Sequence, residues 1–382
     1  MCIAKIVNSV SEIPSDIFDK LFESQVEARG FYKTLEESDI GPFKYYYLLI
    51  IQNQKIISIA PLFLLNFKLD LFAPENVQNY INKIRLVFNN FFCFRTLICG
   101  SPALDYAYIG FDKNFLHRKQ ELIELIYKEM VNFTRKINAS SIGFKDFGEE
   151  FKDLDILKDY GAIRVAAYPC VIQRLAGASI DDFFKSLNSS KRHDLKRKIK
   201  KLKDLPELKL EVKNSLDNNE LERIYELYLE TFKRSSIHFE KLSKDFFIKI
   251  QENMKDDVKF FIYKIGGKIV GFNLCFVKYG VFLDKFLGLD YEYLYKYHLF
   301  FNRFFLNIEW CYKNSLSIYQ SGQTGYDGKI QLAGRLKPLY IYGRHLNSFI
   351  NLLLKPIFFI VQPKNFDPIF KLIPKYKFQQ LN

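Results

Sequence analysis

Two series of apolar and polar segments follow one another along the chain in the same order. In the first series, apolar runs over 43–51 and 55–65 are separated by Asn53 and Gln54. Two such runs joined by a short polar turn predict a β-hairpin. A further strand is predicted over 94–100 and a short strand over 141–144. Between them, apolar residues at helical spacing predict a long helix over 114–137.

The second series begins with a hairpin at Gly266 and Gly267, flanked by apolar and β-branched runs. A third strand is predicted over 281–288, a long helix over 293–314 and a short strand over 316–319. Both series therefore have the order hairpin, strand, long helix, short strand. We expect a mixed α/β (α+β) fold in two tandem domains, followed by a tail. The expected bounds are 1–175 and 176–350 for the domains and 351–382 for the apolar and basic tail.

The stretch from Ser321 to His345 is the densest in glycine and polar residues. It is predicted to be a loop that leaves one strand and returns through the next. Glycines let the backbone approach a ligand, and the polar side chains supply donors, acceptors and charge. The candidate residues of this stretch are Gln323, Thr324, Tyr326, Asp327, Lys329 and His345. The alternative for His345 is a structural histidine.

The most basic segment lies between the two halves, from Ser179 to Asp204. Leu195, Ile199 and Leu202 continue an apolar helical face, and lysines and arginines occupy most of the other positions. A solvated basic helix would have this pattern. The functional alternative is a phosphate-binding helix, with the donor bound by residues near its start: Arg192, His193 and Arg197.

Composition narrows the classes of partner and of site. The 56 lysines and arginines against 43 acidic residues give a net charge of +13, which favours anionic partners or serves solubility. The six cysteines show no C-x-x-C spacing and no Cys/His cluster occurs, so no metal site is expected. We expect a cytoplasmic protein, because no secretory signal or membrane-spanning run is found. The apolar run from Phe349 to Val361 leaves peripheral membrane contact as an alternative to a helix docked on the core.

Several motifs in this order resemble the FemAB-like branch of the GNAT acyltransferase superfamily. The first half has ESQVEARGFYKTLEESD and a hairpin that ends in IAPLFL. The second has SSKRHDLKRKIKKL, FLGLDYEYLYKYHLFFN and SGQTGYDGKIQLAGRLKPLYIYGRH. The resemblance covers about residues 20–350. It implies two GNAT-like domains, each with a largely antiparallel mixed sheet flanked by helices.

The resemblance also implies acyl transfer to an amine. Lys329 stands where the family has a lysine that stabilises negative charge in the reaction, although Gly328 precedes it where the family usually has an aromatic residue. Asp105, in the first-half motif GSPALDY, is the candidate to orient or deprotonate the amine, and Tyr326 is the candidate acid. The alternatives are a lysine that pairs with Asp327 or with solvent, a turn carboxylate at Asp105 and a packed loop aromatic at Tyr326.

The donor is expected to be acyl-CoA or an acyl carrier protein, bound as a substrate and not as a resident cofactor. The pyrophosphate-binding Q/R-x-x-G-x-G/A turn of ordinary acetyl-CoA enzymes is absent from LDYEYLYKYHLFFN. An aminoacyl-tRNA-dependent transferase that acts on a cell-wall precursor is the alternative. A non-catalytic nucleic-acid-binding protein is a further alternative, in which the basic helix would contact phosphates and the aromatic residues, 17% of the chain, would stack on bases.

Overall fold

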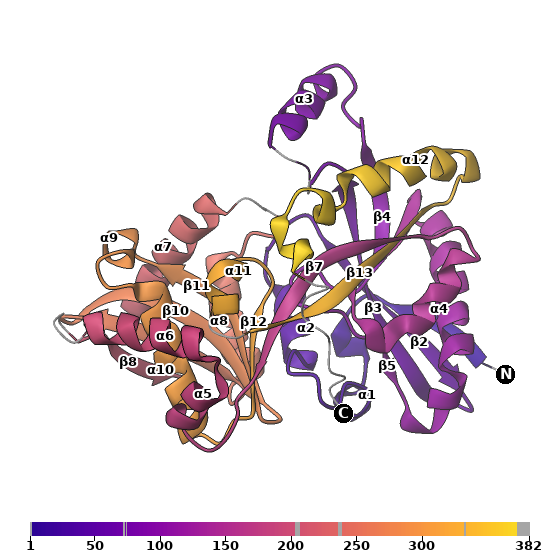
Figure 1. Cartoon of the computed structure of the whole chain (residues 1–382). Helices are drawn as coiled ribbons and strands as arrows, with labels where there is room; N and C mark the ends of the chain where they lie inside the picture. Colours follow the sequence, from indigo (N-terminus) through magenta and orange to yellow (C-terminus); the bar gives the residue numbers. More distant parts are fainter. Residues whose placement is uncertain are drawn as a thin grey trace. The chain divides into compact units, whose positions relative to one another are not determined.

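The structure is a computed structural model that describes residues 2–372 except 72, 74, 203–206, 236–238 and 332–333, and only the backbone of 201, 202, 327 and 361. The chain forms two compact units (Figure 1). Unit 1 is Met1–Pro169 together with Lys337–Asn382, and unit 2 is Cys170–Leu336.

Unit 1 is built on a mixed sheet with the strand order β1-β2-β3-β4-β6-β13, and the short β5 pairs with β3. The strands are β1 (Cys2–Val7), β2 (Lys44–Gln52), β3 (Lys55–Lys68), β4 (Cys93–Cys99), β5 (Gly110–Phe111), β6 (Ser141–Phe147) and β13 (Arg335–His345). Its helices are α1 (Ser15–Leu21), α2 (Arg29–Glu37), α3 (Glu75–Arg85), α4 (Lys119–Lys136) and α12 (Ser348–Val361). The 3-10 helices are η1 (Val10–Glu12), η2 (Lys113–Arg118), η3 (Glu149–Lys158), η4 (Pro363–Asn365) and η5 (Pro368–Lys371).

Local chemistry explains the best-predicted part of unit 1. Asn53 and Gln54 have φ of 49° and 63°, the left-handed values that a tight two-residue hairpin turn needs. The predicted hairpin is therefore confirmed as β2 and β3. The apolar residues of the predicted long helix lie on one face of α4 and are buried in the core of unit 1: Leu122, Ile123, Ile126 and Met130.

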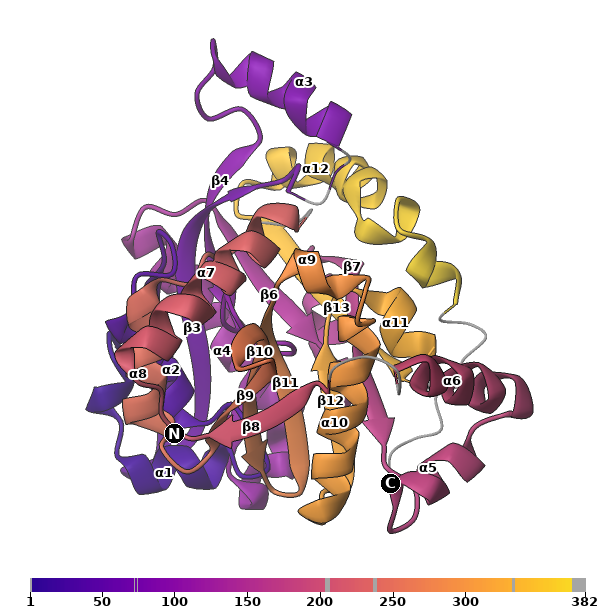
Figure 2. The same ribbon diagram turned by 90° about the vertical axis from the view of Figure 1, so that its left-hand side faces the viewer.

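Unit 2 has the strand order β7-β12-β11-β10-β9-β8, with β7 (Ile163–Arg174) entering from unit 1. The other strands are β8 (Lys209–Lys213), β9 (Val258–Ile265), β10 (Lys268–Lys278), β11 (Val281–Leu289) and β12 (Ile318–Gly322). The helices are α5 (Ile180–Ser186), α6 (Ser189–Leu202), α7 (Asn218–Arg234), α8 (Lys244–Met254), α9 (Tyr291–Leu294), α10 (Leu299–Lys313) and α11 (Tyr326–Gln331). Figure 2 shows the ribbon from a second side.

The repeat predicted from the sequence is confirmed. Antiparallel β2-β3-β4 is followed by α4 and by β6, which pairs with β4 in parallel. Antiparallel β9-β10-β11 is followed by α10 and by β12, which pairs with β11 in parallel. The strand that follows each repeat pairs with a strand of the other repeat. The end of β7 pairs with β12 of unit 2, and β13 pairs with β6 of unit 1.

This exchange makes the domain division differ from the expected one. The first unit ends at Pro169 where residue 175 was expected, and the chain returns to it at Lys337. Because β13 pairs with β6 and the Phe358 ring of α12 lies against Gly343 of β13, residues after 336 belong to unit 1 and not to a second domain that ends at 350.

Two predicted elements are wrong in detail. The long helix over 293–314 is two helices, α9 and α10, separated around His298, whose φ of 42° does not fit a continuous helix. The stretch 321–345 is not a loop, because it contains α11 and most of its C-terminal half is β13. Strands β1 and β8 and helix α3 were not predicted. Among the described helices, none combines the length and hydropathy that crossing a membrane requires.

Candidate functional site

The candidate site in unit 2 begins where β12 ends. Pairing of β12 with β7 skips Ser321, which forms a β-bulge between Gln320 and Gly322. A tight turn follows, in which Gly322, Thr324 and Gly325 have positive φ values. A bulge leaves its residue out of the strand ladder and re-aims the chain. The carbonyl of Ser321 is therefore available to a side chain from another element.

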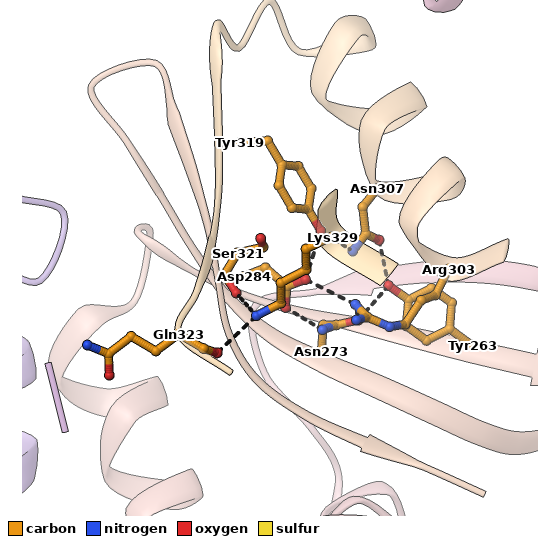
Figure 3. A network of polar contacts seen from close by, with 9 residues as sticks. All are labelled: Tyr263, Asn273, Asp284, Arg303, Asn307, Tyr319, Ser321, Gln323 and Lys329. Atoms are coloured by element: carbon orange, nitrogen blue, oxygen red, sulfur yellow. Dashed lines mark hydrogen bonds and ion pairs between the residues drawn. The ribbon is translucent and has the colours of Figure 1, made fainter. Parts of the chain in front are cut away.

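Lys329 of α11 donates a hydrogen bond to this carbonyl. Its Nζ donates to Ser321 O and, at 3.0 Å, to Gln323 O, and only 7% of the residue is exposed (Figure 3). A buried ammonium needs such acceptors, because removing a charge from water is costly without them. The contacts hold the turn 321–325 against α11. Lys329 is therefore a buried cation with a defined position, and not a solvent-exposed one.

In the family that the sequence resembles, the position of Gly328 usually holds an aromatic residue. A Cβ built on Gly328 would lie 2.1 Å from Cε1 of Phe300, a residue of α10. The aromatic ring thus comes from another helix and occupies the space that a side chain at Gly328 would take. This residue has to be glycine for α11 to approach α10 at this distance.

The parallel strands β11 and β12 pair over only part of their length. Their register runs from Val281 and Ile318 to Leu283 and Gln320. Beyond Leu283, β11 continues to Leu289 and its described strand pairing is with β10 alone. The sheet of unit 2 therefore has a strand edge along the second half of β11, next to the point where β12 turns toward Lys329.

A buried polar network lies under this point of the sheet (Figure 3). Arg303 of α10, with 1% exposure, donates from Nη1 to Asp284 Oδ2 at 3.0 Å and to Asn273 Oδ1 at 3.1 Å. Tyr319 of β12 donates its hydroxyl to the same carboxylate oxygen at 2.8 Å. Asp284 also accepts from the Asn273 side-chain amide. The network thus joins β10, β11, β12 and α10 through one carboxylate.

The surroundings of each side chain in this network determine whether that side chain is charged. Burial lowers the pKa of Arg303, but the Asp284 carboxylate together with Tyr319 and Tyr263 outweighs burial, so the pKa is raised above its ordinary value. Burial raises the pKa of Tyr319 and of Tyr263, so both phenols stay protonated. The Tyr263 hydroxyl lies within hydrogen-bond distance of Asn273 and of Asn307. A paired charge with neutral donors around it is the arrangement that a buried ion pair requires.

These network residues were not among the predicted site residues, although the sequence carried a signal. Arg303 and Asn307 are spaced by four positions in the otherwise apolar helix sequence LFFNRFFLNIEWCYK. That spacing places both on one helical face, and both are buried. A charged residue and an amide on the inner face of an apolar helix indicate a polar partner in the core.

The basic helix α6 contacts α11. Lys191 Nζ donates to Ile330 O at 3.0 Å, and Lys198 Nζ donates to Gln331 Oε1 at 3.0 Å. Lys198 also lies 4.2 Å from the centre of the Phe301 ring. Burial lowers the pKa of Lys191. The structure therefore brings the predicted basic helix and the predicted polar stretch together within unit 2.

The three predicted donor-binding residues lie away from this contact. His193 and Arg197 are exposed and Arg192 is half-buried. Arg197 forms an ion pair with Asp194 at 2.7 Å. Lys191 and Lys198 lie on the face of α6 that contacts α11. Most of the other lysines and arginines of α6 lie on its outward face. A role of Arg192, His193 and Arg197 in donor binding stays a prediction.

The other predicted residues of the stretch lie at the start of α11 and before it. Tyr326 is the first residue of α11 and is buried, Gln323 is half-buried, and Thr324 is exposed in the turn. The side chain of Asp327 lies outside the described part of the structure. Their roles in acid catalysis or substrate binding stay predictions.

Asp105 and His345 belong to unit 1. Asp105 is half-buried in the segment between β4 and β5. His345 ends β13, where its Nδ1 accepts the backbone N–H of Asn347 at 3.1 Å and its ring packs edge-on against Phe94. Burial lowers the pKa of His345. These contacts fix the position of His345 at the turn into α12. The role of Asp105 in catalysis and that of His345 in substrate binding stay predictions.

A charged pocket of about 550 Å³ lies at the far end of β11 in unit 2. Arg223 of α7 pairs with Asp290 at 2.7 Å, and Lys268 lies 3.4 Å from the same carboxylate. Arg234 stacks over Tyr291, 4.1 Å from the ring centre. None of the predicted site residues lines this pocket. In the described part of the chain, no group of three or more metal-binding side chains comes together.

Comparison with known proteins identifies the family. The profile of the FemAB-like family, described as peptidoglycan biosynthesis/recognition, matches residues 111–345. The chain belongs to this FemAB-like family. The matched region contains all of unit 2 with its bulge, its buried network and Lys329. No curated protein sequence matches the chain.

Solved structures show the same fold at low sequence identity. FemX is 10% identical with a TM-score of 0.58, and the match covers 92% of this chain and 100% of FemX. L-PGS from Bacillus licheniformis is 9% identical with a TM-score of 0.52, over 93% of this chain and 98% of that one. A tandem GNAT protein from the clavulanic acid biosynthesis pathway is 9% identical with a TM-score of 0.51, over 90% and 98%. The chain therefore has the FemAB-like, tandem GNAT fold.

Proposed function

We propose that the protein is a transferase that moves an acyl or aminoacyl group from a phosphate-bearing donor, acyl-CoA or an acyl carrier protein, to an amine acceptor. In this reaction the amine nitrogen attacks the thioester carbonyl and a tetrahedral oxyanion forms. The C–S bond then breaks, the amine loses a proton and the thiol leaves. FemAB-like family membership and the similarity to FemX and to a tandem GNAT protein support a transferase.

The strand edge of β11 beyond Leu283 is the observation that carries this proposal. Both CoA and carrier proteins present the acyl group on an arm that contains amide groups. An extended chain of this kind can pair with the backbone N–H and C=O groups of a strand edge. The bulge at Ser321 and the Lys329 turn lie where this edge begins, so the thioester at the end of the arm would lie near that turn.

Lys329 has two effects in this proposal. Its contacts with Ser321 O and Gln323 O hold the turn, and its buried charge is little screened by water. A cation placed in advance stabilises an oxyanion more strongly in such surroundings than in bulk water. The outward cations of α6 would attract the phosphate groups of the donor.

The test is thiol release from a panel of acyl-CoAs with amine acceptors. Lys329→Met should slow the reaction at least tenfold, about 1.4 kcal/mol in the barrier. Lys20→Met, in an exposed ion pair of unit 1, is the control that should keep the wild-type rate. Reversing Arg192 and Arg197 to Glu should raise the Michaelis constant for the donor more than it lowers turnover. An unchanged rate for Lys329→Met removes the lysine from the mechanism.

An aminoacyl-tRNA donor is the second candidate, with peptide-bond formation on a cell-wall precursor. The outward cationic face of α6 and the peptidoglycan description of the family favour it. Assays with aminoacyl-tRNA in place of acyl-CoA distinguish the two donors. A tRNA donor should show a steep loss of affinity with salt, because phosphate contacts release counterions. RNA binding with this slope and no transfer to any acceptor would favour a non-catalytic nucleic-acid-binding protein.

A further inference from the structure

Helix α12 is apolar on two faces, and unit 1 covers only one of them. On the inner face, Leu354 is buried and the ring of Phe358 lies against Gly343 of β13. Asn351 fixes the same face through Gly161 O and the backbone N–H of His345. The outer face is formed by exposed large apolar residues: Phe349, Leu352, Leu353, Phe359 and Ile360. A helix with apolar residues all round is normally covered all round.

Helix α3 and the turn after it present a second apolar surface. Only Ile81 of α3 is buried. The exposed residues are Val77, Tyr80, Leu86, Val87 and Phe88, and Leu86 is 83% exposed. Arg85 holds the base of this segment by donating to Asp70 and to Phe91 O. Figures 1 and 2 both show α3 projecting at the same end of unit 1 as α12.

The exposed apolar residues of the described chain are concentrated in these two segments. Sixteen large apolar residues are exposed in the described chain. Five belong to α3 and the turn after it, five belong to α12, and Phe366 belongs to the segment after α12. Single exposed apolar residues are common on soluble proteins, but large continuous groups mark interaction sites. The remaining five are scattered over both units: Ile3, Leu116, Ile248, Tyr279 and Tyr295.

The charges around these residues select the kind of partner. The sequence of α12 contains no acidic residue, and Lys355 lies at the edge of its outer face. Lys83 on α3 and Lys364 and Lys371 after α12 are exposed as well, and the one acidic residue of α3 is the exposed Glu75 at its start. Lysines beside exposed apolar residues fit a surface that is anionic outside and apolar within, because the long lysine stem lets the charge reach the polar layer.

We propose that α3 and α12 together form a docking surface for an anionic lipid bilayer. The apolar side chains enter the boundary between head groups and acyl chains, and the four lysines contact the anionic head groups. The protein lies on the membrane and does not span it. This surface belongs to unit 1 and is independent of the transfer chemistry proposed for unit 2.

The test is flotation of the full chain with phosphatidylcholine vesicles, with and without phosphatidylglycerol. Binding should be stronger with phosphatidylglycerol and should fall as salt rises. Leu352→Ser/Leu353→Ser and Leu86→Ser/Phe88→Ser should each weaken binding at least tenfold, with unchanged thermal unfolding because these residues are exposed. Lys355→Glu/Lys364→Glu should remove the preference for phosphatidylglycerol.

Leu116→Ser/Ile248→Ser is the matched control, because both residues are exposed and lie outside α3 and α12. It should bind vesicles like the wild type. Failure of the wild type to float with either vesicle overturns the proposal, as does equal loss in the control. Light scattering tests whether the chain forms a dimer through this surface. A dimer that dissociates in Leu352→Ser/Leu353→Ser, together with no vesicle binding, would show that a second copy of the chain covers this surface.

Discussion

The two repeats have the same order of elements but differ in how their parallel strands pair. In unit 1, β4 and β6 pair from Thr96 and Ser141 up to Cys99, the last residue of β4. In unit 2, the pairing of β11 and β12 stops at Leu283, and β11 continues to Leu289. In unit 1 the pairing therefore reaches the end of β4, whereas in unit 2 β11 extends beyond the pairing and has a strand edge.

The helices that follow show a matching difference. The inner face of α4 in unit 1 contains Leu122, Ile126 and Met130 in an apolar core. The inner face of α10 in unit 2 contains Arg303 and Asn307, which bind the polar side chains of β10, β11 and β12. The same order of elements therefore surrounds an apolar helix face in unit 1 and a buried ion pair beside a strand edge in unit 2.

The largest expected effect comes from breaking the buried pair in unit 2. Arg303→Met leaves the Asp284 carboxylate buried without its cation and should cost about 3–5 kcal/mol of unfolding free energy. Met130→Leu in α4, a volume-conserving change at the matching helix of unit 1, should cost less than about 1.5 kcal/mol. The measurement is denaturant unfolding. The single tryptophan, Trp310 of α10, packs on Phe261 and reports unit 2, whereas circular dichroism reports both units.

The double variant Arg303→Met/Asp284→Leu separates charge from packing. Replacing a buried ion pair by apolar residues is often neutral, so this variant should recover most of the lost stability. If it does not, the hydrogen bonds of Asp284 to Tyr319 and Asn273, rather than the ion pair, hold the network together.

A smaller effect is expected at the contact of α11 with α10. Gly328→Ala places a Cβ where the Phe300 ring lies, so the ring must shift, and the change should cost about 2 kcal/mol through overpacking. Transfer activity should fall as well, because Lys329 is the next residue. Tryptophan fluorescence during unfolding and initial rates measure the two losses.

The companion variant is Gly328→Ala/Phe300→Leu, in which the smaller side chain makes room for the new methyl group. It should be more stable than the sum of the two single changes predicts. Additive losses would mean that the backbone at Gly328, and not the Phe300 ring, sets the limit.

The smallest expected effect concerns His345 in unit 1. Burial lowers the pKa of this histidine in the folded state, so the unfolded chain binds more protons on acidification. Its contribution to stability is complete above the unfolded pKa, about 6.5, and is lost as the pH falls toward the folded pKa. His345→Asn should therefore flatten the fall in stability below that pH. Unfolding midpoints over a pH series check this, with His193→Asn, at an exposed histidine, as control.

Much of the local structure was predictable because short-range chemistry decides it. The hairpins at Asn53-Gln54 and Gly266-Gly267, the apolar face of α4 and the order of the two repeats follow from turn residues and spacing. Strand β8 was missed because its sequence, KLEVK, has three charged residues in five positions and is typical of an exposed segment. The stretch 321–345 was predicted to be a loop because its glycines weigh against a helix, yet packing of Gly328 on Phe300 favours α11.

The candidate site was predicted in part. Lys329 and the basic helix were named from the sequence, and the structure brings α6 and α11 together. The contact residues, however, are Lys191 and Lys198. Helical spacing shows which residues share a face, but the packing of the helix decides which face meets a neighbour. The same limit applies to Asp284, whose partners come from three other elements.

The sequence by itself determined the repeat, the hairpins, the cationic helix and the position of a lysine in a glycine-rich stretch. Turn conformations and apolar spacing act over a few residues, so they can be read along the chain. Only the tertiary structure decided that β7 and β13 pair with strands outside their own repeats. It also decided that β11 extends beyond its pairing with β12 and that Arg303 forms an ion pair with Asp284. Strand partners and buried ion pairs depend on distances between segments far apart in sequence. Packing and the desolvation of charge, and not local preference, set those distances.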